Sequence, residues 1–406
     1  MPPTASNPLT ILCLASYEKG AEFLRECKRQ NCRVLLLTSK SIGPAPWPKE
    51  SIDELFLMHD VNKHWELDHV LKSVSYLARR ENIDLIVPLD DFDLETAAAL
   101  REHLRVPGMG ESATRYFRDK LAMRLRAREA GITVPEFIHV LNYDRVREFM
   151  QRVPPPWLLK PRLEASASGI QRINSSEQFW DAVNDLGDRL SYHLMERYVP
   201  GDIYHVDSIV SDARVVFAEV HRYGKPPLDV AQGGGIFTTA TLTRGSSDEQ
   251  TLLRLNEEVL TAMGLARGVS HTEFIRAHDG GEFYFLETSA RVGGAHIVEL
   301  VEAATGINLW AEWAKIEIAR GEDAYHLPPH REDYGGLIVS LARQPYPDTS
   351  AYTDPEIVWR LNKRAHAGLI LSSHDEKRIH HLLEDYTRRF DAEFSATHPM
   401  PDRPTS

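Results

Sequence analysis

Short apolar runs alternate with helix-like segments through the first hundred residues, and this alternation restricts the fold more than any other feature of the chain. Strands are predicted at residues 9–15, 33–39 and 84–90, and helices at 18–30 and 94–104. Strands that alternate with helices form right-handed βαβ units around a parallel sheet. The turn after the first strand, ASYEKG, lacks the glycine pattern of a dinucleotide site. We therefore predict a Rossmann-like domain that does not bind a dinucleotide.

Length and charge limit the kinds of protein that this chain can be. Its 406 residues exceed one ordinary hydrophobic core, so two or three domains are expected. A net charge of −12 argues against a nucleic-acid or anionic-membrane partner, because both need a basic surface. No apolar run approaches the length of a membrane span, and the N-terminus lacks the basic region of a signal peptide. The three cysteines lack C-x-x-C spacing and fit reduced thiols in a cytoplasmic protein.

The middle of the chain is predicted to form a second unit. A helix at residues 117–131 ends at Gly131, and a proline-rich hinge leads into the strand WLLKP. Antiparallel strands are predicted between residues 192 and 222. Residues 230–246, VAQGGGIFTTATLTRGS, are predicted to form a mobile glycine-rich loop.

A hairpin is predicted where the runs VSHTEFIRA and EFYFLETS flank the turn signal DGG at residues 279–281. A two-residue loop would pair Glu273 with Leu286 and send Glu287 to the other side of the sheet. A three-residue loop that includes Gly281 would instead place Glu273 directly opposite Glu287. The two carboxylates would then stand roughly 5 Å apart at Cβ, which is destabilising without a partner.

In the second register, one face of the hairpin would carry both acids among apolar side chains: Glu273, Glu287, Ser289 and Arg291 with Ile275, Phe283 and Phe285. Bound magnesium would cancel the repulsion, because a hard divalent cation prefers carboxylate oxygens. The alternative is a pair of solvated glutamates on an edge hairpin. Arg291 favours the first interpretation, since a guanidinium can grip a carboxylate or a phosphate with two hydrogen bonds.

Two further segments have the chemistry of a nucleotide site. Lys160 ends an apolar strand and precedes RLEASASGI, a small-residue loop whose N–H groups could cradle phosphate, although an ordinary loop fits equally well. In MERYVPG, Glu196 could accept a hydrogen bond, and the backbone near Val199 could contact an adenine edge. Glutamates beside turns are also common without such a role. The chain has no G-x-x-x-x-G-K-[ST], H-E-x-x-H or G-x-S-x-G motif.

The order of these motifs resembles the ATP-grasp superfamily. The motifs are DK at Lys120, KP at Lys160, ERYVPG at Glu196, HTE at Glu273 and ETSARVGG at Glu287. The resemblance covers nearly the whole chain and is greatest to the L-amino-acid-ligase and biotin-carboxylase-type branches. It implies an α/β protein with the ATP-grasp fold, in which a Rossmann-like parallel-sheet domain precedes an antiparallel-sheet nucleotide-binding core. The implied boundaries are 1–115 for the first domain, 116–320 for the ATP-grasp domain with a lid at about 133–196, and 321–406 for a C-terminal subdomain.

The resemblance also implies roles for individual residues. ATP would be held at its phosphates, adenine and ribose by Lys120, Lys160, the flap residues Ser166, Ser168 and Gly169, Glu196, Val199, and His205 or Asp202. Mg²⁺ or Mn²⁺ would be bound by Glu273, Glu287 and Ser289. Substrate would be contacted by Arg291, Gly293, Gly294 and Gly234. The family usually has asparagine where this chain has Ser289, and the flap EASASG is poor in glycine.

The implied activity is ATP-dependent joining of a small-molecule carboxylate to an amine, with amino acids as substrates. An acyl phosphate would form first, and Arg291, Glu273 and Glu287 would stabilise the developing charge. The family also suggests a homodimer. The alternatives are a carboxylase that uses bicarbonate and a regulatory module that binds nucleotide without turnover.

Overall fold

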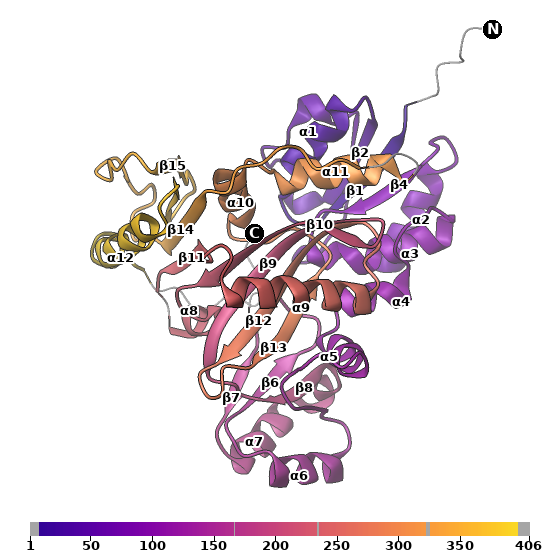
Figure 1. Ribbon diagram of the computed structural model, residues 1–406. Helices are drawn as coiled ribbons and strands as arrows, with labels where there is room; N and C mark the ends of the chain where they lie inside the picture. Colours follow the sequence, from indigo (N-terminus) through magenta and orange to yellow (C-terminus); the bar gives the residue numbers. More distant parts are fainter. Residues whose placement is uncertain (1–7, 166, 234, 322–324, 397–406) are drawn as a thin grey trace, which may run out of the picture.

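The computed structural model describes residues 8–165, 167–233, 235–321 and 325–396. The described residues form three sheets. In Figure 1, the sheet with β1, β2 and β4 lies at the top, the sheet with β6, β7 and β8 lies at the bottom, and the sheet with β9 to β13 lies between them. No helix in the described ranges is long and apolar enough to cross a bilayer. The three segment boundaries given above remain predictions.

The N-terminal sheet is four-stranded and parallel, in the order β3-β2-β1-β4, which confirms the predicted Rossmann-like arrangement. Strands β1, β2 and β4 are almost completely buried because their side chains pack against helices on both faces, whereas the edge strand β3 exposes Leu55 and Leu57. The elements are β1 (Thr10–Ala15), α1 (Ala21–Arg29), β2 (Arg33–Ser39), β3 (Glu54–Met58), α2 (Leu67–Leu77), β4 (Leu85–Pro88), α3 (Leu94–Leu104) and α4 (Glu111–Thr114).

The second sheet is small and antiparallel, in the order β5-β8-β6-β7. One face packs on α6 and α7 through Trp157, Phe149 and Phe179, and the other face carries Lys160 and Glu196. The elements of this part are α5 (Lys120–Glu129), β5 (Phe137–His139), α6 (Tyr143–Arg152), β6 (Trp157–Pro161), β7 (Gln171–Ile173), α7 (Ser176–Leu186) and β8 (His193–Arg197).

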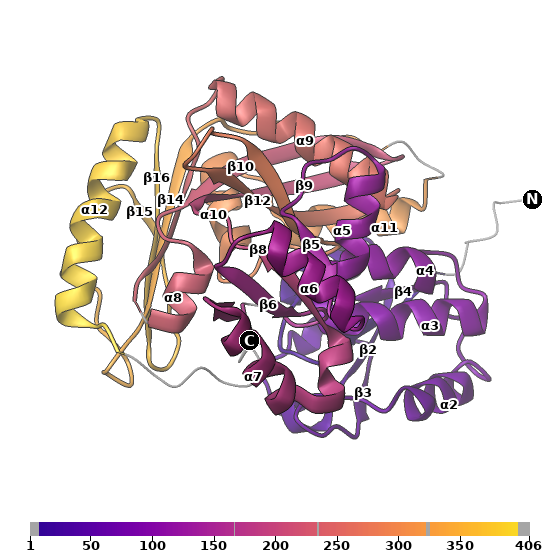
Figure 2. The same cartoon turned by 90° about the horizontal axis from the view of Figure 1, so that it is seen from below.

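The third sheet is antiparallel and eight-stranded, in the order β13-β12-β9-β10-β11-β14-β16-β15, so the C-terminal strands extend the central sheet. Figure 2, seen from below, shows α12 along one side of the molecule and the N-terminal sheet at the other. The elements are β9 (Gly201–Ser211), β10 (Arg214–Tyr223), α8 (Pro227–Gly233), β11 (Phe237–Thr241), α9 (Ser247–Met263), β12 (Gly268–Ala277), β13 (Phe283–Ser289), α10 (Ile297–Thr305), α11 (Leu309–Ala319), β14 (Tyr334–Leu341), β15 (Ile357–Arg360), β16 (His366–Ser373) and α12 (Glu376–Glu393).

The prediction of a mobile loop at residues 230–246 is wrong for much of that segment. Residues up to Gly233 belong to α8, and Phe237–Thr241 form β11, which pairs with both β10 and β14. The run FTTAT is rich in aromatic and β-branched residues, and its ladder of hydrogen bonds on both sides outweighs the preceding glycines. Gly234 lies outside the described residues.

The hairpin β12–β13 pairs Glu273 with Glu287, which is one of the two registers predicted. A three-residue turn was expected to produce this pairing, but the turn does not produce it. The loop is 278–281, closed by the Ala277 N–H, which donates to the Glu282 carbonyl at 2.9 Å. Next to it, Phe274 pairs with Phe285, which is the register of the two-residue loop. The register shifts only beyond Phe274, so Leu286 is the extra residue of a β-bulge.

The bulge also corrects the predicted composition of the hairpin face. Phe283 and Phe285 do not share a side with the two glutamates; they pack with Phe274 and Tyr204 in the core beneath α5 and α9. Because the bulge lies at Leu286, both Leu286 and Glu287 face the opposite side of the sheet.

Candidate active site

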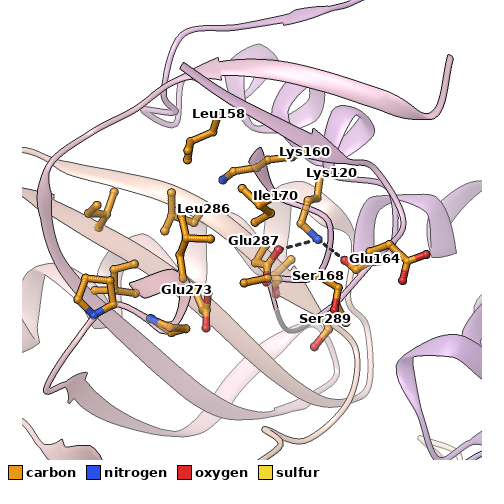
Figure 3. Close-up of a pocket in the computed structure, with 18 of the residues that line it drawn as sticks. Lys120, Leu158, Lys160, Glu164, Ser168, Ile170, Glu273, Leu286, Glu287 and Ser289 are labelled. Carbon is orange, nitrogen blue, oxygen red and sulfur yellow. Dashed lines mark hydrogen bonds and ion pairs between the residues drawn. The ribbon is translucent and has the colours of Figure 1, made fainter. Parts of the chain in front are cut away.

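A cavity of about 390 Å³ lies between the small sheet and the hairpin. Figure 3 shows side chains from both walls converging on it. One part is apolar, and its lining includes Leu158, Ile170, Val199, Ile203, Ile275 and Leu286. The other part is charged, and its lining includes Lys120, Lys160, Glu196, Glu273, Glu287 and Arg291. A cavity divided in this way suits a ligand with a flat apolar end and an anionic end.

Lys120 is positioned by the start of α5. Asp119 caps this helix by accepting from the N–H groups of Leu121 and Ala122, which places Lys120 at the first helical position. The Lys120 ammonium lies 2.9 Å from Glu287 Oε2 and donates to the Glu164 carbonyl at 2.6 Å, as Figure 3 shows. Burial would raise the pKa of Glu287, but the charge and hydrogen bond of Lys120, with the charges of Lys160 and Arg124, lower it to about 2. Glu287 is therefore ionised at neutral pH.

Lys160 belongs to a buried charge cluster that the sequence did not reveal. Its ammonium forms an ion pair with Glu196 across the adjacent strands β6 and β8. The same carboxylate accepts from Arg124 Nη2 at 3.0 Å and Nε at 3.1 Å. Burial alone would raise the pKa of Glu196, but Arg124 and Lys160 lower it. Glu196 thus holds two cations and also lines the cavity, and its predicted contact with adenine stays a prediction.

Glu273 has its own partners, one on its own strand and one on β10. Tyr223 on β10 donates its hydroxyl to Glu273 Oε1 at 2.9 Å, and His271 Nε2 lies 3.6 Å from the same oxygen. Burial would lower the pKa of His271, but Asp207 and Glu273 raise it to about 9, so this imidazole is cationic at neutral pH. Protein groups therefore offset the charge of both glutamates, and the repulsion between them does not by itself require a metal.

Behind Glu273, a completely buried carboxylate connects three histidines. The ring nitrogens Nδ1 of His205 and His271 lie 2.7 and 2.9 Å from the two oxygens of Asp207. His221 stacks on His205 with centroids 4.8 Å apart, and its Nδ1 is 3.8 Å from Asp207. The donor atoms of Asp207, His205 and His271 lie within 4.8 Å of one another, a spacing that could hold a metal ion. Their mutual hydrogen bonds already satisfy these atoms, so we interpret the cluster as support for the strand that carries Glu273.

The hairpin offers oxygen atoms that fit a hard divalent cation. Lys120 pairs with one oxygen of Glu287 and Tyr223 with one oxygen of Glu273. Ser289, next along β13, is 7% exposed, and its hydroxyl has no hydrogen-bond partner among the described residues. The second oxygen of each carboxylate together with this hydroxyl forms a donor set that suits Mg²⁺. The predicted metal ligands therefore fit the ion as a group.

Arg291 lines the cavity beyond Glu287. Its Nη1 donates to the Val292 carbonyl at 2.6 Å, and its Nε lies 3.9 Å from Asp91 Oδ1 without a hydrogen bond. This leaves donors of the guanidinium for a substrate anion. Gly294 lines the same region, whereas Gly293 does not: a Cβ there would lie 2.8 Å from Asp207 Oδ1, so Gly293 serves close packing.

The other predicted nucleotide contacts are only partly brought together. Val199 and Ser168 line the cavity. Gly169, with φ of 70°, turns the chain behind Ser168, where a Cβ would meet Pro161. Ser166 lies outside the described residues.

Two predicted ribose contacts lie away from the cavity. Asp202 pairs with Arg222 at 2.9 Å on the other side of the strand. His205 is completely buried between Asp207 and Thr239, so neither residue is placed to reach a ribose. Sequence reasoning also missed Asp91 and Arg118, which line the charged end and form an ion pair at 3.1 Å.

No protein-family model matches the chain. The L-arginine-specific L-amino acid ligase of Bacillus subtilis is 23% identical over 306 residues, which cover 74% of this chain and 72% of that protein. The crystal structure of L-amino acid ligase from Bacillus licheniformis has a TM-score of 0.73 at 15% identity, covering 97% of this chain and 99% of its own. Carboxyaminoimidazole ribonucleotide synthase from Aspergillus clavatus, solved with ATP, has a TM-score of 0.71 at 15% identity, covering 94% and 99%.

The three sheets, the site between two of them and these likenesses define the class: the chain has the ATP-grasp fold. More particularly, its relatives are L-amino-acid ligases and other ATP-grasp ligases, which confirms the resemblance that the motifs predicted.

Proposed function

We propose that this protein is an ATP-dependent carboxylate–amine ligase that joins amino-acid substrates through an acyl phosphate. The observation that carries the proposal is the meeting of Lys120, Lys160, Glu273, Glu287 and Arg291 in one cavity, although they come from separate segments of the chain. The ligase names of the relatives support the same class of reaction. The proposed reaction uses none of these groups as a nucleophile, so catalysis rests on positioning and on charge stabilisation.

ATP fits the two parts of the cavity. The adenine ring is a flat apolar group and would lie among Leu158, Val199 and Leu286, whose side chains exclude water. The phosphates would extend toward Lys120 and Lys160. The Lys160 side chain is fixed by Glu196, so its position is set before the nucleotide arrives.

The first chemical step would occur beside Arg291. An oxygen of the substrate carboxylate attacks the γ-phosphorus, the bond from that phosphorus to the bridging oxygen breaks, and ADP leaves. Arg291 would orient the carboxylate, and Lys120 would offset negative charge on the phosphoryl oxygens. Mg²⁺, held by Glu273, Glu287 and Ser289, would supply further charge neutralisation at the phosphates when bound.

In the second step an amine nitrogen attacks the acyl carbon, the carbon–oxygen bond to phosphate breaks, and the amine loses a proton. An amide, phosphate and ADP are the products. The acyl phosphate must be protected from water during this step. The small sheet and the segment from Pro226 to Val230 cover the cavity on either side and would provide that protection.

A hydroxylamine assay tests the proposal. The protein is incubated with ATP, Mg²⁺, hydroxylamine and each of the common amino acids, and hydroxamate and phosphate are measured. A hydroxamate that requires ATP and a particular amino acid supports an acyl phosphate. Nucleotide binding without turnover on any carboxylate would instead favour a regulatory module.

Matched variants locate the chemistry in the cavity. Glu287→Gln should reduce hydroxamate formation at least a hundredfold, because it removes a carboxylate proposed to hold Mg²⁺. Glu282→Gln changes an exposed carboxylate immediately before the same strand and should leave the rate within twofold. Equal rates for the two variants would contradict the site assignment.

A further inference from the structure

The N-terminal sheet has a topological switch point at the carboxyl ends of β1 and β4, and Asp91, in the loop after β4, lines the cavity. In the order β3-β2-β1-β4, the strand β1 lies between β2 and β4. The chain therefore crosses from β1 to β2 on one side of β1, and β4 is added later on the opposite side. Loops that follow two such strands diverge, and ligands of α/β sheets bind in the opening between them. Here these loops are residues 16–20 after β1 and 89–93 after β4.

Two lysines lie at this end of the sheet. Lys19, from the loop after β1, forms an ion pair of 2.5 Å with Asp90, from the loop after β4. Lys63, from the segment after β3, lies 4.1 Å above the centre of the Tyr17 ring, and Lys19 lies 5.6 Å from the same centre. Two ammonium groups therefore share one aromatic ring.

A series of side-chain contacts connects Tyr17 to the charged end of the cavity. The rings of Tyr17 and Phe92 stack with their centroids 5.3 Å apart. The Arg118 guanidinium lies 5.1 Å from the centre of the Phe92 ring, and Arg118 also lines the cavity. Arg118 and Arg291 both contact Asp91, at 3.1 and 3.9 Å. A ligand held at Arg291 could therefore extend past Asp91 toward the lysines.

A third lysine comes from the C-terminal part of the chain. Lys363 lies in the connection between β15 and β16. Burial lowers the pKa of Lys63, and the charges of Lys19 and Lys363 lower it further against the opposing charges of Asp90 and Asp60. Burial and Lys19 likewise lower the pKa of Lys363, against the opposing charge of Glu18. The three ammonium groups thus lie within one another's electric fields, an arrangement that a bound anion stabilises.

These lysines differ from ordinary solvated ones. All three side chains are partly buried, and that of Lys19 is 28% exposed. Lys72, by comparison, is 73% exposed and pairs with Asp68 along its own helix. Partial burial of converging cations beside aromatic rings has a desolvation cost that a solvated surface avoids.

We propose that Lys19, Lys63 and Lys363 form a subsite for an anionic group, a carboxylate or a phosphate, on the amine substrate. The inference rests on the proposed ligase function, since Arg291 takes the carboxylate that reacts and the lysines take a second anion. Tyr17 and Phe92 would contact the part of the substrate that joins the amine to this anion.

Calorimetric binding of matched probes tests the subsite without requiring turnover. The probes are O-phospho-L-serine against L-serine, and L-glutamate against L-glutamine, each added to the full chain with ADP and Mg²⁺. The proposal expects at least one anionic probe to bind ten or more times more tightly than its neutral partner. The phosphate and carboxylate pairs distinguish the two kinds of anion. Lys63→Met and Lys363→Met should each reduce the preference about tenfold, whereas Lys72→Met should preserve it.

The outcomes separate this proposal from the proposed function. Equal affinity within both pairs, absence of binding by both anions, or an unchanged preference in Lys63→Met and Lys363→Met would overturn the subsite. The hydroxamate assay is run on the same protein preparations. Hydroxamate formed while the subsite fails leaves the ligase proposal standing, and a lysine-dependent preference without any hydroxamate would retain an anion site while the ligase function is rejected.

Discussion

Arg124→Met is expected to be one of the most destabilising substitutions at the site. Arg124 is 1% exposed, and two of its nitrogens donate to Glu196 at 3.0 and 3.1 Å. A third contact is its donation to the carbonyl of Leu286, the residue of the bulge. Methionine fills similar space without charge, so the main effect is the loss of these interactions. Glu196 would then remain buried with Lys160 as its only cation.

The magnitude follows from the burial of both partners. Removal of one member of a buried ion pair leaves a charge without its counter-ion and costs about 3–5 kcal/mol. Lys160 remains beside Glu196 and offsets part of this loss, so we expect about 3 kcal/mol. Loss of the donor to Leu286 would also loosen the bulge that sets the position of Glu287. Affinity for MgATP should therefore fall together with stability.

Urea unfolding, followed by circular dichroism, measures the change in the free energy of unfolding. Arg128→Met, an exposed arginine on the same helix, is the control and should change stability by less than about 0.5 kcal/mol. A loss below about 1 kcal/mol for Arg124→Met would refute the reasoning from buried charge.

Two further predictions concern close packing and pH. Gly293→Ala should cost about 1–3 kcal/mol, because its Cβ would lie 2.8 Å from Asp207 Oδ1, whereas Gly294→Ala meets nothing within 4 Å and should be nearly neutral; equal urea midpoints would contradict this. Burial and the charge of Asp90 raise the pKa of Asp93 from 3.8 to about 7, so the folded protein binds this proton more tightly and stability falls as pH rises between these values. The free energy of unfolding of Asp93→Asn should rise relative to that of the wild type by up to ~4 kcal/mol between pH 4 and pH 7. Parallel curves of stability against pH for the two proteins would show that burial does not raise the pKa of Asp93.

Local sequence patterns predicted the parts of the fold that depend on local periodicity. The parallel N-terminal sheet followed from the alternation of strands and helices, and it is present. The pairing of Glu273 with Glu287 was one of two registers that turn chemistry allowed. The choice depended on a bulge at Leu286, which has no sequence signature, since any residue can occupy it. Arg124, far along the chain, holds its carbonyl in place.

Partners far apart in sequence were beyond such reasoning. The resemblance implied a role for Glu196 at adenine, but nothing near it in the sequence indicated its counter-ion Arg124, which lies 72 residues earlier in the chain. The resemblance implied that His205 contacts ribose, yet its side chain lies beside that of Asp207, two residues further along β9, and both are completely buried. Alternation along β9 could have indicated that His205 and Asp207 share one face, as Ile203 and Ile209 do. No pattern within the strand shows which part of that face is buried beneath other side chains and which part lines the cavity.

The pairing of Lys120 with Glu287 makes metal and nucleotide binding interdependent. A divalent cation at Glu287 must compete with an ammonium that is already 2.9 Å away. A triphosphate offers Lys120 a new anion and releases the carboxylate for the metal, so Mg²⁺ and ATP should bind with positive coupling. Lys120→Met should strengthen Mg²⁺ binding in the absence of nucleotide, weaken ATP binding, and reduce the coupling between them. Calorimetric titrations of each ligand with and without the other measure this coupling, and equal coupling in wild type and variant would show that Lys120 does not link the two sites.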